Sequence, residues 1–141
     1  MPKQTIFMGT TSISAEKTAA EIMAVLVASG ARQIASDFDA QGKISGMRFV
    51  VESRGQPVAF ALPVRVEPLL QHLRGDRAQA ERVAWRQLYR WAQAQLALIE
   101  VGMVMPEEVY TPYALQSDGR TLYEALSAGN FKQLAAPAER D

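Results

Sequence analysis

The sequence has no cysteine and a single histidine, His72, among its 141 residues. Without cysteine the chain cannot form disulfides, bind zinc through thiolates or use a thiol nucleophile. His72 lies in the run QHLRG, which has no nucleophile-elbow pattern, so we interpret it as a structural or surface residue rather than a catalytic one. No Gly-rich phosphate loop of the Walker or Rossmann type occurs. These absences favour a binding protein over an enzyme, and we expect no cofactor.

The sequence also lacks a net charge, because 15 basic residues balance 15 acidic ones. A basic excess, which is typical of proteins that bind nucleic acids nonspecifically, is therefore missing. The charges are unevenly placed, however. Residues 65–90 carry six arginines against three acids, and residues 100–124 carry five acids against one arginine. This separation suits an anionic ligand or head-to-tail self-association, so we expect a homo-oligomer.

Long apolar runs are the third absence. Ile22–Ala28 is among the longest, and it is far shorter than a membrane span. The start of the chain, MPKQTIFMGTTS, has no apolar segment of signal-peptide length. We therefore expect a cytoplasmic protein without membrane contact. The length fits one domain, which we place at residues 1–134, with 135–141 as a frayed tail.

The strongest pattern present is Asp76–Glu100, which predicts one long amphipathic helix. Apolar side chains recur at helical spacing around Leu88, Ala92 and Ile99, and they form a stripe wide enough to cover a sheet. Asp76 follows a glycine and is a suitable N-cap, because its carboxylate can accept from free amides of the first turn. The rest of the chain is expected to pack around this helix.

Three arginines spaced four apart, Arg82, Arg86 and Arg90, fall on the face opposite the apolar stripe. One interpretation is a solvated face. The other is a surface that contacts phosphates or carboxylates, with Tyr89 beside the row as a stacking platform. The candidate nucleic-acid or anion-binding residues are Arg82, Arg86, Arg90, Tyr89, Arg74 and Arg48.

The remaining segments predict an α+β fold. It consists of an antiparallel meander of three to four strands packed against an N-terminal helix and the long helix, with short C-terminal helices. The expected strands are Thr5–Gly9 at an edge, Ala31–Phe38, Lys43–Glu52 and Pro57–Leu62. The other expected helices are Ala15–Ser29, Val66–Arg74 and Leu122–Ser127, the last with a capping box formed by Thr121 and Glu124. The segment Val104–Leu115 is expected to hold one more short helix, which starts at Pro106 and is ended by Pro112.

A pair of carboxylates, Asp37 and Asp39, ends the Ala31–Phe38 strand. Two carboxylates at this spacing can share a hard cation, but aspartate is also common in turns because it accepts from turn amides. We favour the turn interpretation and expect no metal site.

A set of short segments lies between Phe60 and Leu126, namely FALP, RAQAERVAWR, AQLA, GMV, EEV, PY and TLY. In these segments the chain resembles small uncharacterised proteins encoded by tailed phages and prophages. The resemblance implies a mobile-element origin but no activity or catalytic residues.

Two functional hypotheses follow. The first is a phage-type accessory protein that contacts nucleic-acid phosphates through the arginine-lined helix. The alternative is a protein–protein interaction module, such as an inhibitor of a host factor, that acts as a homo-oligomer. In either case the expected location is the cytoplasm of the host cell.

Overall fold

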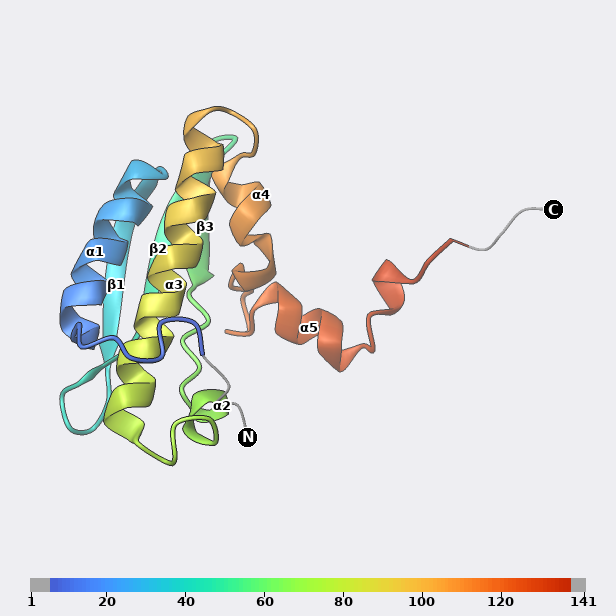
Figure 1. The fold of residues 1–141 in the computed structure, drawn as a ribbon. Helices are drawn as coiled ribbons and strands as arrows, with labels where there is room; N and C mark the ends of the chain where they lie inside the picture. The colour runs from blue at the N-terminus through green and yellow to red at the C-terminus, as the bar shows by residue number, and fades with distance from the viewer. Residues whose placement is uncertain (1–5, 138–141) are drawn as a thin grey trace.

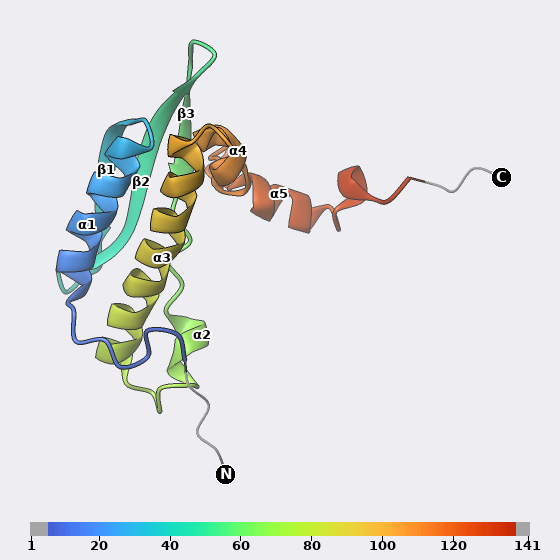
Figure 2. The same ribbon diagram turned by 45° about the horizontal axis from the view of Figure 1, so that its top comes forward.

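The computed structural model describes residues 6–137, and it confirms the predicted α+β class. A three-stranded antiparallel sheet is covered on one face by helices, with the long helix α3 in the middle of the layer (Figure 1). The C-terminal segment projects away from this two-layer body, and it does so in both views (Figure 2).

The sheet is a meander in the order β1-β2-β3, formed by β1 (Ala31–Phe38), β2 (Ile44–Ser53) and β3 (Gln56–Ala61). The predicted strands differ from these by at most one residue at each end. Along β2, Met47, Phe49 and Val51 are buried under the helices, while the alternate residues lie on the open face of the sheet.

The two edges of the sheet differ. The edge of β3 is extended by the segment around Ala114 and Leu115, since Phe60 forms a bridge with Ala114 and the Leu115 amide donates to the Ala59 carbonyl at 2.8 Å. β1 pairs only with β2 among the residues that the structure describes.

Helices α1 (Ala15–Ala28) and α3 (Arg77–Glu100) lie side by side on the sheet. Both begin where the sequence predicts. The Ser14 hydroxyl accepts from the Lys17 amide at 3.1 Å, and the Asp76 carboxylate accepts from the Gln79 amide at 3.0 Å.

An aromatic cluster joins the sheet to the segment after α3. Phe49 and Phe60 stack at 5.3 Å between ring centroids, and Tyr110 meets Phe49 edge-on at 5.0 Å and Trp91 at 5.5 Å. Tyr110 is fully buried, so this cluster anchors α4 (Pro106–Tyr110) against the sheet.

Two predicted elements are wrong or shortened. Ile6–Gly9 forms a turn rather than a strand, closed by a hydrogen bond from the Gly9 amide to the Ile6 carbonyl at 2.7 Å; Thr5 lies outside the described residues. The helix predicted at 66–74 is reduced to α2 (Glu67–Leu70), because Arg74 and Gly75 both have positive φ and turn the chain into α3.

The chain after α4 forms short helical pieces. They are the 3-10 turn η1 (Thr111–Tyr113), the helix α5 (Leu122–Ala128) and the 3-10 turn η2 (Lys132–Leu134). Residues 135–137 follow without regular structure, and the rest of the predicted tail, 138–141, lies outside the described residues. Within residues 6–137, the helices are too short or too polar to cross a membrane.

Candidate interaction site

The middle arginine of the predicted row is buried, which corrects the expectation that all three lie on a solvated face. Only 8% of Arg86 is exposed. Its Nη1 donates to the Glu21 carboxylate of α1 at 3.1 Å, and its guanidinium lies 4.6 Å from the ring centroid of Tyr89. Both contacts hold the charge inside the protein, where it cannot reach a phosphate.

Arg86 is buried because α3 has a second neighbour, the helix α1, in addition to the sheet. The helix packs on the sheet with one side and on α1 with another, so Ala80 and Val83 are buried together with Arg86. The long stem of arginine is apolar and packs well in such a contact if its head finds a partner. Glu21 provides that partner from the neighbouring helix.

The other two arginines of the row are held by side chains of their own helix. Arg82 is half-buried and donates to the Gln79 side chain from Nε at 2.9 Å and from Nη2 at 2.6 Å. Arg90 is exposed, donates to Gln93 at 3.0 Å and lies 5.7 Å from the Tyr89 ring centroid. Arg90 is therefore the member of the row most able to meet an anion.

The two remaining candidates lie elsewhere. Arg48 is on the open face of the sheet, where it forms a two-point contact with Asp37 at 3.2 and 3.0 Å. Arg74 is exposed in the turn between α2 and α3. The structure thus brings Arg82, Arg86, Tyr89 and Arg90 together on α3, but it does not assemble the six residues into one surface.

Asp39 acts in turn formation, as predicted. Its Oδ1 accepts from the amides of Gln41 and Lys43, both at 2.9 Å, while Asp37 pairs with Arg48 instead of sharing a site with it. His72 is exposed in the turn after α2. Across residues 6–137, clusters of three or more His, Asp or Glu suited to a metal ion do not occur.

A feature that the sequence did not single out is the C-terminal arm, which we define as residues 122–134. None of the residues of α5 is buried, and the arm carries Tyr123, Phe131 and Leu134 with 43%, 40% and 65% of their surface exposed. Tyr123 and Phe131 contact each other at 5.9 Å between ring centroids, and Arg65 of the body lies 5.9 Å from the Tyr123 ring. The Leu122 amide also donates to the Ala114 carbonyl at 2.8 Å, so these contacts join the base of the arm to the body.

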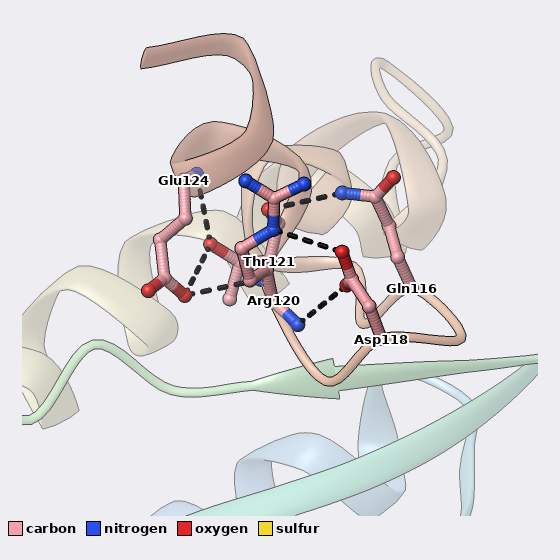
Figure 3. A network of polar contacts seen from close by, with 5 residues as sticks. All are labelled: Gln116, Asp118, Arg120, Thr121 and Glu124. Carbon is pink, nitrogen blue, oxygen red and sulfur yellow. Dashed lines mark hydrogen bonds and ion pairs between the residues drawn. The ribbon is translucent and has the colours of Figure 1, made fainter. Parts of the chain in front are cut away.

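The base of the arm is held by a polar network (Figure 3). Asp118 accepts from the amide and the Nε of Arg120 at 3.0 and 2.9 Å, and Gln116 donates to the Thr121 carbonyl at 3.3 Å. Thr121 and Glu124 form the predicted capping box, with amide-to-side-chain bonds of 3.0 and 3.2 Å. These contacts close the turn before α5 and cap the start of the helix.

These contacts also lower the pKa of two carboxylates at the base of the arm. Hydrogen bonds from the backbone and side chain of Arg120 lower the pKa of Asp118, and those from Thr121 lower the pKa of Glu124. Both carboxylates are thus stabilised as the charged acceptors that hold the turn and the start of α5.

A local hydrophobicity pattern reveals that residues 122–128 form a helix, but not whether the body covers it. The composition of the arm could have drawn attention to it, because Glu124 and Lys132 are its only charged residues among several apolar ones. Such a segment is expected either to pack on its own domain or to bind elsewhere.

Comparisons of the chain with protein-family models, with curated proteins and with solved structures found no match. The resemblance to phage proteins stays a prediction.

Proposed function

We propose that this protein is a protein–protein interaction module that binds a partner protein through its C-terminal arm. The observation that carries the proposal is the exposure of Tyr123, Phe131 and Leu134 on a segment that projects away from the body. Full burial of an exposed apolar side chain contributes about 1.5–3 kcal/mol. Because these three residues are 40–65% exposed, roughly half of that contribution is still available from each for association.

The preformed helix of the arm favours binding as well. A segment that is fully disordered before binding loses conformational entropy when it docks, and this cost subtracts from its affinity. The arm is already helical at α5 and is held at its base by Thr121 and Glu124. Less ordering therefore remains to be done on contact with a partner.

The chemistry of the arm defines the kind of surface that would receive it. Aromatic and aliphatic side chains dominate, and Glu124 and Lys132 are the only charges among residues 122–134. An apolar groove with a polar rim fits this pattern, as in the recognition of a short amphipathic helix by a hydrophobic groove. A host factor with such a groove is the partner class that we propose.

The test compares two variants that remove equal numbers of exposed apolar side chains. The first carries Tyr123→Ser, Phe131→Ser and Leu134→Ser in the arm. The control carries Val101→Ser, Met103→Ser and Met105→Ser at the turn after α3, where 72%, 68% and 58% of these residues are exposed. Each purified chain is used to capture proteins from a lysate of the source cell, and any captured protein is then purified and titrated.

We expect the control to bind the purified partner as the wild type does, and the arm variant to lose at least ten-fold in affinity. A partner that binds the arm variant normally, or that is lost only with the control, would refute the proposal. Circular dichroism of both variants checks that the fold is retained.

Nucleic-acid binding stays as a second candidate in a narrower form. Arg90 is exposed and lies against Tyr89, which is the combination that a single-stranded nucleic acid would use for phosphate contact and base stacking. Fluorescence anisotropy with labelled single-stranded DNA and RNA tests it. Salt-sensitive binding that disappears in Arg90→Glu supports this candidate, and an absence of binding at low salt eliminates it. A phage origin and a cytoplasmic location remain part of the proposal in either form.

A further inference from the structure

From the free edge of the sheet we infer that β1 is a self-association site, where a second copy of the chain adds its own β1 in antiparallel orientation to make a six-stranded sheet. This inference is independent of the arm. Figures 1 and 2 show α1 and β1 on the flank of the body opposite the arm. The two surfaces can therefore be tested separately.

The contrast between the two edges is the first argument. The chain covers the edge of β3 with its own residues 114–115, but it leaves β1 paired on one side only among the described residues. β1 has eight residues, so its edge is about 27 Å long at roughly 3.4 Å per residue. Native proteins commonly protect such edges with proline, charged side chains or bulges. β1 has no proline or lysine, and its charges and bulges lie towards its two ends, so residues 33–36 form an uncharged and regularly paired stretch.

The register of β1 indicates where the two copies would meet. Its pairing with β2 is regular from Gln33 to Asp37, and the irregularities lie towards the two ends of the strand. The centre of the regular stretch is Ala35. A two-fold axis perpendicular to the sheet at Ala35 keeps the helices of both copies on the same face and places Gln33 opposite Asp37 of the second copy.

The side chains along this edge are self-complementary in that register. On the open face, Arg32 pairs with Glu52, and Asp37 pairs with Arg48. Antiparallel pairing about Ala35 brings Gln33, with Arg32 beside it, towards the Asp37 carboxylate of the other copy. Because the axis repeats the contact, two sets of donors meet two carboxylates, whereas a parallel arrangement would bring like charges together.

The outer face of α1 continues the same flank. The exposed residues of α1 are mostly small or apolar, with Glu16 and Lys17 in its first turn as charged exceptions. The exposed fraction is 60% for Val27 and 62% for Phe38 at the end of β1. Small side chains allow two helices to approach closely, so the later turns of α1 in one copy can pack beside α1 of the other above the joined sheets. The small or apolar exposed positions are Ala20, Ala24, Val27 and Ala28.

The natural absence of cysteine permits a direct test. Ala35→Cys places one thiol on the proposed axis, where it faces its own copy across the two strands at a separation that a disulfide can bridge. Ala97→Cys, at an exposed position on α3, is the matched control. Under mild oxidation we expect the first variant to form a covalent dimer and the second to stay monomeric.

Charge exchange provides the second test, which is measured by sedimentation of the chain without an introduced cysteine. Asp37→Arg is expected to weaken the dimer at least ten-fold, and adding Arg32→Glu is expected to restore it, because the exchanged charges again oppose each other across the axis. Inside one chain the same pair of changes meets Glu52 and Arg48 with like charges. A purely intramolecular role therefore predicts that the double variant is the worst of the three.

A wild-type chain that sediments as a monomer at its highest soluble concentration would overturn the inference. So would equal cross-linking of Ala35→Cys and Ala97→Cys. The arm variant described above should dimerise normally, which separates this result from the test of the proposed function.

Discussion

Arg86 offers the sharpest test of how α3 is placed, because two interpretations of the arginine row predict opposite results. If the row were a solvated face, reversing the charge of Arg86 or of Arg90 would change stability by no more than about 0.5 kcal/mol. In the structure Arg86 is buried against α1, so we expect the Arg86→Glu variant to lose much more stability than Arg90→Glu.

The magnitude follows from three contributions. A hydrogen bond to a charged group contributes about 1.5–3 kcal/mol when it is buried, and the contact with the Tyr89 ring adds about 0.5–1 kcal/mol. The first value belongs at its lower end, because 31% of the Glu21 side chain is exposed and water screens the pair. The third contribution is the repulsion between the new carboxylate and Glu21. We therefore expect a loss of about 3 kcal/mol, or roughly 10 °C in Tm for a chain of this size.

The assay is urea unfolding followed by tryptophan fluorescence, for which the buried Trp85 is a suitable reporter. A charge exchange distinguishes the ion pair from a general intolerance of the site. Glu21→Arg combined with Arg86→Glu should regain more than half of the loss, because opposite charges again meet between the helices. The reasoning is refuted if Arg86→Glu is no more destabilising than Arg90→Glu, or if the exchange recovers nothing.

Three further predictions concern titration and capping. Burial raises the pKa of Tyr110 to about 12, against a smaller lowering contribution from the Ser29 side chain. The unfolded chain then ionises this phenol at lower pH than the native one, so stability falls as pH rises above 10. Urea unfolding at pH 8 and 11 should show a loss of about 1.4 kcal/mol in the wild type that is missing in Tyr110→Phe. At the base of the arm, the pKa values of Asp118 and Glu124 are lower in the native than in the unfolded chain. Their contribution to stability is therefore fully present above the unfolded-state pKa, and it is lost as the pH falls through the lowered native pKa. The protection factor of the Thr121 amide, which donates to the Glu124 carboxylate, should therefore fall on acidification before those of the α3 amides, and a simultaneous fall would contradict this. Finally, Asp76→Ala should cost about 1 kcal/mol in urea unfolding by removing the N-cap of α3, whereas an unchanged midpoint would show that the cap contributes nothing.

The sequence predicted the secondary structure well where local chemistry determines it. Ser14, Asp76 and Thr121 mark helix starts because their oxygens satisfy free amides of the first turn, and all three form the expected bonds. The strands between glycine-containing turns were also correct to within a residue. Thr5–Gly9 failed because a short β-prone run becomes a strand only if another strand is available to pair with it.

The environment of α3 was harder to predict, since it depends on two neighbours at once. Periodicity identifies a main apolar stripe, and Trp85 and Ala92 on it are indeed buried. It does not reveal that α1 lies along another side and covers Arg86. An arginine in a helix is read as exposed on hydrophobicity alone, although its stem is apolar and its head needs only one partner.

The arm was missed for a related reason. The capping box at Thr121 and the apolar residues of α5 were visible in the sequence, but a pattern within one segment does not say which surface will cover it. In many domains such a helix packs on its own core. Here the helix projects away from the body, and Tyr123, Phe131 and Leu134 stay exposed.

The most direct measurement of the proposed function is site-specific photo-cross-linking in the source cell. A photoreactive phenylalanine analogue replaces Phe131 in the arm or, as a control, Met103 at the turn after α3; both natural residues are exposed and apolar. If the arm is the docking element, the analogue at position 131 will give a discrete cross-linked protein and that at position 103 will not. If position 131 gives no product, or the same products as position 103, the arm does not bind a partner and the proposed function is wrong.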